Sequence, residues 1–320
     1  MKPPRRTAAA AGMIALATLP LWAPSPYGAE LGVAVALFAI LSTGLNLVYG
    51  YTGLLSFAQA AFFGIGGYTS ALLWTNWGCP MLAGALTGGV LAALLGLIIG
   101  YSSLRLSRHA FAIVSLSLTL LCLIIARDWV SLTRGPMGLP GLAAPRMALP
   151  ALGEVRFDGP VAFYYLMLCY AAIVLLMTHR LVRSRIGRAF IAIKLNQPLA
   201  ESQGIDPVRY RLLALALSAL TTGIAGGLYV FHLTIVDPSV FDFYYTESML
   251  IMVIVGGPGS FWGVLAASAA FSLLPDLLRF SADLRMILYG MVLIAAMLML
   301  PRGLAGRSAK RVSASRRVHA

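Results

Sequence analysis

The chain has 320 residues, of which 59% are hydrophobic and 11% are charged, and its mean hydropathy of +0.85 lies well above that of a soluble globular domain. This composition excludes a soluble protein and indicates a protein embedded in the lipid bilayer. The formal net charge of +13 does not predict nucleic-acid binding, because Lys and Arg fall in short segments between apolar runs and no recognition module accompanies them.

The apolar runs predict an all-α, polytopic transmembrane helical bundle that forms one domain over residues 1–320. A helix needs about 20 apolar residues to cross the hydrocarbon core. The candidate segments are 8–23, 31–49, 54–75, 81–101, 110–127, 161–179, 212–231, 246–257, 261–278 and 286–301, which gives about nine or ten membrane segments. The first follows three basic residues and is either a signal peptide or an uncleaved span; the absence of a small-x-small cleavage site favours the span.

The basic residues predict the orientation of the bundle. If the N-terminus is cytoplasmic and the spans alternate, segments 1–7, 102–109, 180–211 and 302–320 lie inside and hold three quarters of the chain's 24 lysines and arginines. This asymmetry is typical of cytoplasmic loops. Both termini are therefore expected in the cytoplasm, with 302–320 as a basic tail. That arrangement needs an odd number of passes after residue 246, so the short run 246–257 counts as a pass or as part of a broken helix.

The longest loop, 128–160, is expected on the extracytoplasmic side. It is rich in Gly and Pro, which predicts turns and a little structure of its own. A loop of this length is more often functional than idle, so it is interpreted as a docking surface for a soluble partner, with a passive connector as the alternative.

The cytoplasmic segment 180–211 has unusually clear helix signals. Residues 184–195 place Ile186, Ala189, Phe190 and Ile193 on one face, which predicts a short amphipathic helix. A second helix over 198–203 would have Pro198 at its first position, Glu201 in its first turn and Gly204 as a left-handed stop. Asp206 and Pro207 then start the helix that enters the membrane, where Arg209 and Arg211 are expected to snorkel to the interface. Such a folded loop suits a groove on another protein; an amphipathic helix resting on lipid headgroups is the alternative.

Polar residues inside the membrane suggest a translocation path. In segment 54–75, Ser56, Gln59, Phe63 and Ser70 recur at helical spacing, while Ala60, Gly64, Gly67 and Ala71 offer close helix packing. Gln59 is the most informative, because an unpaired amide in hydrocarbon is costly and must face a partner or a cavity. The sequence "GGPGSFWG" at 256–263 is either a broken helix, with Ser260 capping the helix that follows, or a tight turn between two spans.

The sequence indicates no metal site, no nucleotide hydrolysis and no ion coupling in this chain. Three cysteines and four histidines are scattered without ligand spacing, so no metal site is predicted. No GxxxxGK[ST] motif occurs, so any nucleotide hydrolysis would need another chain. The acids near the spans are all expected at outer ends, which argues against a coupling proton or sodium ion; they are Asp237, Asp242, Glu247, Asp276 and Asp283.

Several motifs together resemble the branched-chain amino acid ABC transporter permease family. The pattern from Gly187 to Tyr210, with Gly-Arg-Ala, Ala-Glu, Gly-Ile and Arg-Tyr at fixed spacing, is similar to that family's coupling region. The stretches "GYTGLLSFAQAAFFGIGGYTSALL" (50–73), "LTRGPMGLPG" (132–141) and "GGPGSFWGVLAASAAFSLLPDLLR" (256–279) follow in the family's order. The chain looks more like the longer of the two paired permeases.

The resemblance implies a permease subunit of an ABC importer, without enzymatic activity, in the inner membrane of a bacterium. It implies two ATPase subunits that bind ATP and Mg²⁺, a second permease subunit, an extracytoplasmic binding protein, and no cofactor in this chain. Arg188, Glu201, Gly204 and Ile205 would then contact an ATPase subunit. The expected cargo is a branched-chain amino acid or another small, largely apolar amino acid or amide. The main alternative is an ion-driven secondary transporter; a membrane-embedded enzyme would need a catalytic cluster, and none is visible.

Overall fold

The computed structural model describes residues 26–103, 108–142, 146–149, 153–156, 159–277 and 290–291. The predicted first span, 8–23, and the basic tail, 302–320, lie outside these residues, as does all but a two-residue piece of 286–301.

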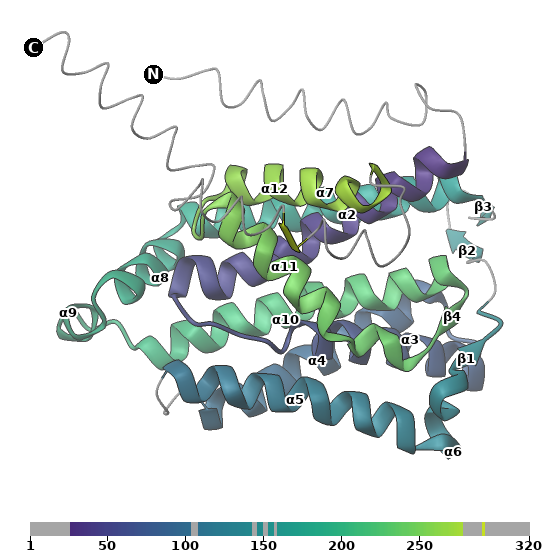
Figure 1. Cartoon of the computed structure of the whole chain (residues 1–320), viewed down its shortest axis with the longest axis horizontal. Coiled ribbons are helices and arrows are strands. Elements are labelled where there is room, and N and C mark those ends of the chain that lie inside the picture. Colours follow the sequence, from purple (N-terminus) through teal and green to yellow (C-terminus); the bar gives the residue numbers. More distant parts are fainter. Residues whose placement is uncertain are drawn as a thin grey trace, which may run out of the picture.

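Long helices run side by side along the long axis of the molecule (Figure 1). They are α2 (Pro26–Leu45), which continues into the π-helix η1 (Asn46–Tyr51), and α3 (Gln59–Trp77), α4 (Met81–Ser103), α5 (Arg108–Asp128), α7 (Pro160–Arg183) and α10 (Pro207–Leu233). Two shorter helices, α11 (Phe243–Gly256) and α12 (Phe261–Leu277), pack against each other. The described part of the chain is thus a helical bundle with only short strands.

The predicted count of nine or ten spans is not confirmed. Six stretches of the described chain are long and apolar enough to cross a membrane. One of them reaches this length only because the 3-10 helix η3 (Pro238–Phe241) precedes α11, while α12 is shorter than a full span. The predicted count came from the number of apolar residues in each segment. In the structure, part of that apolar sequence forms helices such as α11 and α12, which are too short to cross a membrane alone.

Segment 54–75 is not one helix. Residues 53–57 are not helical, and α3 begins only at Gln59. Side chains from other helices bond the unwound backbone: Ser115 Oγ accepts from the Phe57 N–H at 2.9 Å, and Thr119 Oγ1 donates to the Phe57 carbonyl at 2.9 Å. Thr246 Oγ1 donates to the Phe57 carbonyl at 3.4 Å and accepts from the Ala60 N–H, in the first turn of α3, at 3.2 Å. Since unpaired backbone groups are costly away from water, these hydroxyls explain how the buried chain can leave the helical conformation.

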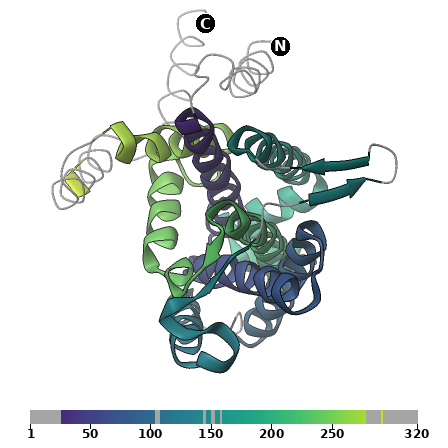
Figure 2. The same ribbon diagram turned by 90° about the vertical axis from the view of Figure 1, so that its right-hand side faces the viewer.

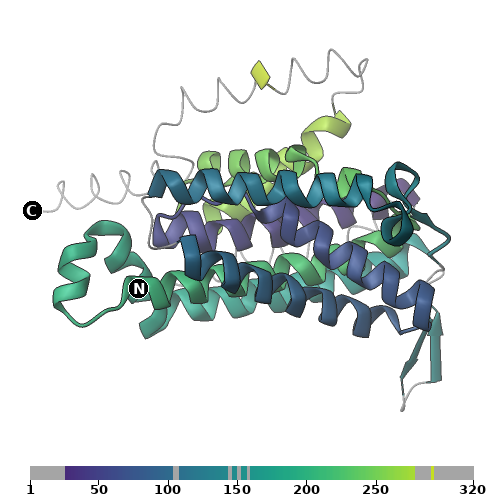
Figure 3. The same cartoon turned by 90° about the horizontal axis from the view of Figure 1, so that it is seen from below.

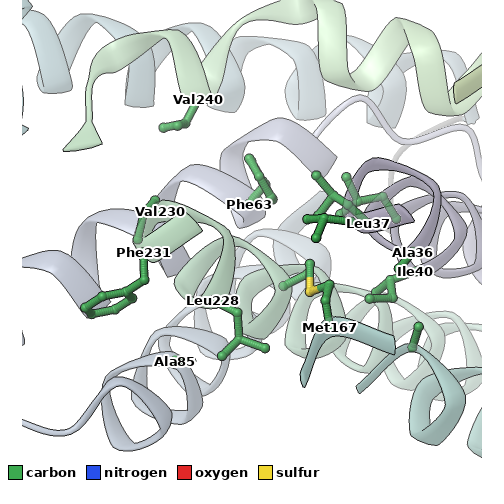
Figure 4. Close-up of a cluster of buried hydrophobic side chains, with 14 of the residues drawn as sticks. Ala36, Leu37, Ile40, Phe63, Ala85, Met167, Leu228, Val230, Phe231 and Val240 are labelled. Carbon is green, nitrogen blue, oxygen red and sulfur yellow. The ribbon is translucent and has the colours of Figure 1, made fainter. Parts of the chain in front are cut away.

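The centre of the bundle is built from close helix crossings at small residues. A Cβ atom on Gly66 of α3 would overlap the backbone of Gly223 on α10, and one on Gly226 would overlap the backbone of Phe63. Around these crossings lies the main hydrophobic cluster, drawn in Figure 4 with labelled side chains from α2, α3, α4, α7 and α10. The packing expected for the small residues of segment 54–75 is confirmed at Gly64 and Gly67, where a Cβ would meet Phe241 and Val230.

Replacing Gly66 by valine is expected to destabilise the bundle. The new side chain would force α3 away from α10, and overpacking of this kind costs about 1–3 kcal/mol. Thermal unfolding in detergent, followed by fluorescence-detected size exclusion, should show a lower midpoint. Gly159→Ala is the matched control, because a Cβ there meets no atom within 4 Å; equal midpoints for the two variants would contradict the crossing.

The two ends of the bundle differ. Helices α8 (Arg185–Leu195) and α9 (Gln197–Ser202) lie at one end, and the strands lie at the other (Figure 1). At the strand end, β1 (Leu139–Pro140) pairs antiparallel with β4 (Ile235–Val236), next to α6 (Val130–Thr133) and the 3-10 helix η2 (Gly135–Met137). The hairpin of β2 (Arg146–Leu149) and β3 (Gly153–Arg156) projects sideways from the bundle (Figure 2). The long loop therefore has the local structure that its sequence predicts.

Candidate functional site

Helix α8 is held against the bundle by the apolar face that its sequence predicts. Ser184 caps it by accepting a hydrogen bond from the Ile186 N–H at 3.2 Å. Phe190 and Ile193 are fully buried, and Phe190 shares a cluster with Leu47 and Tyr51 of the π-helix η1. The apolar face predicted for α8 is therefore covered by the protein itself, while Ile191 and Leu195 of the same helix stay exposed.

Helix α9 projects beyond the ends of the neighbouring helices (Figure 3). Asn196 caps it, Gly204 follows it with a φ of 77°, and Asp206 caps α10 by accepting from the N–H groups of Val208 and Arg209. The predicted left-handed stop after α9 and the predicted start of α10 are therefore present. The predicted place of Glu201 was wrong, since the helix begins one residue earlier than expected and Glu201 lies near its end.

The surface of this end carries both charge and apolar side chains. Arg188, Glu201 and Gly204 are exposed and Ile205 is half-buried, with its N–H bonded to the Ala200 carbonyl at 3.0 Å. Leu195 is 78% exposed and Leu199 is 59% exposed. Exposed leucines on a helix that projects from the bundle are typical of a protein contact. We call Arg188, Leu195, Leu199, Glu201 and Gly204 the α8–α9 surface.

A buried arginine fixes the orientation of α9. Arg211, in the first turns of α10, is only 5% exposed and donates from Nη2 to Gln197 Oε1 at 2.9 Å. Gln197 in turn donates from Nε2 to Glu201 Oε1 at 2.9 Å. The expectation that Arg211 snorkels to the interface was wrong, because α9 folds back over it. Arg209 does stay exposed, and it pairs with Asp206 at 3.0 Å.

Lys194 joins α8 to two other parts of the bundle. Its Nζ donates to the Gly50 carbonyl at 2.7 Å and to the Pro258 carbonyl at 3.3 Å. Close by, Asn46 Oδ1 accepts from the Gly259 N–H at 2.9 Å. Burial lowers the pKa of the Lys194 ammonium, and the two carbonyls offset the cost of removing it from water. These residues, which we call the Lys194 junction, link α8 to η1 and to the turn between α11 and α12.

The turn at 257–260 settles the interpretation of "GGPGSFWG". Gly257 and Gly259 have φ values of 95° and 89°, and the Ser260 N–H bonds to the Gly257 carbonyl at 2.9 Å. Helices α11 and α12 fold back on each other across this tight turn, and the stretch is not a broken helix in the middle of a span. Ser260 caps α12 as expected, by accepting from the Gly263 N–H at 3.1 Å. Its helix end lies beside the Lys194 junction.

Four candidate path residues lie inside the packed bundle. Gln59 is fully buried, donates to Ser218 Oγ at 2.8 Å and accepts from Thr222 Oγ1 at 3.0 Å. The amide therefore faces polar partners on α10, which account for its burial without a cavity. The Phe63 ring packs against Tyr229 and Tyr245. Ser56 and Ser70 are each 1% exposed, and a Cβ at Gly84 of α4 would meet Ser70 Oγ at 2.7 Å.

Glu247 lies deeper than its sequence suggests. It was expected at an outer end, but α11 begins at Phe243, so Glu247 is in its second turn. Ten residues separate it from Gly257, a rise of about 15 Å along the helix. Glu247 therefore lies inside α11 and not at its first residue, because the helix begins before the apolar run does. That no carboxylate lies in mid-span stays a prediction.

A profile of the family described as branched-chain amino acid transport system / permease component matches residues 27–297. The chain belongs to this family. Members are permease components without catalytic activity, so the α8–α9 surface and the bundle above it belong to a membrane permease. Within the described residues, no group of His, Cys, Asp and Glu is arranged to hold a metal ion.

The permease is similar to several curated proteins over most of its length. It is 28% identical to the high-affinity branched-chain amino acid transport system permease protein LivM of Salmonella typhimurium, over 86% of this chain and 69% of that protein. It is 27% identical to a probable LivM of Methanocaldococcus jannaschii, over 71% and 74% of the two chains. The LivH permease protein of Escherichia coli is 24% identical, over 88% and 94%. A comparison with solved structures found no significant match.

Proposed function

We propose that this chain is a LivM-like permease subunit of an ABC importer for branched-chain amino acids or similar small, largely apolar amino acids or amides. The observation that carries the proposal is the family match over most of the chain, together with the rigid, projecting α8–α9 surface. The similar LivM and LivH proteins are named as permeases for branched-chain amino acids, which supports the cargo class and a second, different permease as partner.

The end with α8 and α9 is proposed to be cytoplasmic, with both termini on that side. Lys194, which belongs to the segment 180–211 expected inside, bonds there to Gly50 and to Pro258, the ends of two apolar segments. Segments predicted outside meet at the opposite end, where β1 pairs with β4. In this orientation two ATPase subunits, which bind ATP and Mg²⁺, dock on the cytoplasmic loops of the two permeases. The strand end, including Met137, which is 85% exposed, receives the binding protein.

The mechanism follows from the contacts of the α8–α9 surface. An ATPase that closes on ATP pulls α9, whose orientation is fixed through Gln197 and Arg211. Helix α8 carries the motion to the Lys194 junction, which holds the inner ends of η1, α11 and α12. A rigid connection of this kind lets nucleotide binding favour one of two states, open inward or open outward. Of the candidate path residues, Ser56, Gln59, Phe63 and Ser70 lie within the moving bundle and Ser260 lies at its inner end.

Uptake into proteoliposomes tests this function against an ion-driven carrier. The vesicles contain this chain, the second permease and the ATPase subunits, and leucine is supplied with the binding protein outside. Uptake should require ATP inside and the binding protein outside, and an ionophore should leave it intact. Accumulation by this chain alone, driven only by an ion gradient, would overturn the proposal. The carboxylate of Glu247, which lies inside α11, makes this comparison necessary, because ion-driven carriers use carboxylates within membrane helices.

A further inference from the structure

Glu247 opens onto the surface of the chain about midway along the helical bundle. The neighbouring Thr246 supports this position, because it is fully buried and accepts from the Ala60 N–H in the first turn of α3. The first residue of α3, Gln59, bonds Ser218, which lies eleven residues into α10, about 16 Å from its start. Three helices therefore place this part of α11 far from both ends of the bundle, while the Glu247 side chain is exposed.

The side chains around Glu247 differ from those that suit lipid. On the same face of α11, Phe243 is 42% exposed and Tyr244 is 52% exposed, and the Phe243 ring lies 6.0 Å from the ring of Phe57 in the unwound segment. The exposed large side chains of α4 are instead almost entirely aliphatic; they include Leu86, Val90, Leu91, Leu94 and Ile98. A carboxylate that faces hydrocarbon is costly, whereas one that faces a water-filled path is not. No ion pair joins Glu247 to a basic residue within the described part of the chain.

We propose that Phe57, Phe243, Tyr244 and Glu247 line the translocation path, and that the Glu247 carboxylate binds the ammonium group of the amino acid cargo. This rests on the proposed function and adds to it a site on the transporter itself. In an amino acid with an apolar side chain, an anionic acceptor can bind the ammonium group and an apolar wall can contact the side chain. The aromatic rings supply that wall, and their faces also attract cations. The path residues predicted from sequence, Ser56, Gln59 and Phe63, lie behind this face and support it.

The first test is Glu247→Gln in the complete complex. Leucine uptake at saturating loaded binding protein should fall about tenfold or more, the effect of weakening one hydrogen bond to a charged group. ATP hydrolysis stimulated by the binding protein should persist, because the α8–α9 surface and the Lys194 junction are unchanged. Glu247→Asp, which keeps the charge, should retain much of the uptake. Glu30→Gln is the matched control, since Glu30 is also an exposed carboxylate on a membrane helix but lies near the outer end of α2.

Uptake by Glu247→Gln equal to that of the wild type would overturn the site. The wild-type complex in the same vesicles reports separately whether the protein is an ATP-driven importer at all, so the two proposals fail in different ways.

Chemical labelling tests whether the face is open to water or sealed against the second permease. In a chain whose natural Cys79, Cys122 and Cys169 are replaced by serine, Glu247→Cys should react with a charged methanethiosulfonate reagent in the assembled complex. An excess of leucine should slow that reaction. A cysteine that remains unreactive in every nucleotide state would show that the second permease covers Glu247, and the proposed site would be wrong.

Discussion

Reversing the charge at Glu201, with Glu201→Lys, is expected to reduce ATP-driven uptake to background while the chain still inserts and assembles with the second permease. Glu201 is exposed at the tip of the molecule, and its carboxylate also accepts the hydrogen bond through which Gln197 and Arg211 fix α9. A lysine there would repel the positively charged group of the ATPase that the carboxylate is proposed to attract. It also places a second cation near Arg211. Because charged groups at the centre of an interface can dominate binding, we expect ATPase affinity to fall at least about tenfold. Pull-down of the ATPase subunits and uptake should be measured on the same preparation.

Gln203→Lys is the control for this prediction, since Gln203 is an exposed neighbour in the turn that ends α9. It adds a positive charge next to the proposed contact without removing the carboxylate, and it should keep most of the uptake. Glu201→Gln should fall between the two, because it keeps the size of the side chain but loses the charge. Full uptake by Glu201→Lys would show that α9 does not contact the ATPase.

Replacing Lys194 by methionine should uncouple ATP hydrolysis from transport. Methionine keeps an apolar stem of similar length but removes the donors to the Gly50 and Pro258 carbonyls. A hydrogen bond to a charged group contributes about 1.5–3 kcal/mol, enough for η1 and the turn at 257–260 to stop following α8. Uptake should fall about tenfold or more, while binding of the ATPase and its hydrolysis of ATP continue. The ratio of leucine transported to ATP hydrolysed is the measurement.

Arg185→Met is the matched control for the Lys194 junction, because Arg185 is an exposed cation on the same helix. It should leave the ratio unchanged. If Lys194→Met also leaves the ratio unchanged, motion reaches the bundle by another route. If both ATP hydrolysis and ATPase binding are lost, Lys194 supports the α8–α9 surface and does not transmit its motion.

The sequence predicted the α8–α9 region well because its signals are local. Caps, prolines and the left-handed glycine act within a few residues, so Gly204, Asp206 and Pro207 could be assigned without knowledge of the fold. The same applies to the buried face of α8, where Phe190 and Ile193 follow helical spacing. The long apolar helices were found for the same reason, although their number was not.

The interior was predicted less well because distant residues determine it. Apolar sequence over 54–58 reads as helix, but the distant hydroxyls of Ser115, Thr119 and Thr246 bond the Phe57 backbone where it unwinds. Gln59 and its partner Ser218 lie 159 residues apart. The Lys194 junction was missed entirely; its lysine, asparagine and glycines come from three segments that sequence spacing cannot bring together. Of the two interpretations of 256–263, the tight turn is present, whereas the non-helical stretch at 53–57 falls where one continuous helix was expected.

Site-specific photocrosslinking tests most directly the claim that the α8–α9 surface is where the motor acts. A photoreactive residue is placed at Leu199, which is 59% exposed on α9, and in a second chain at Met137, which is 85% exposed at the opposite end. In the assembled complex, position 199 should crosslink to an ATPase subunit, and position 137 should not. A crosslink to the ATPase from position 137, or none from position 199 in any nucleotide state, would contradict the account.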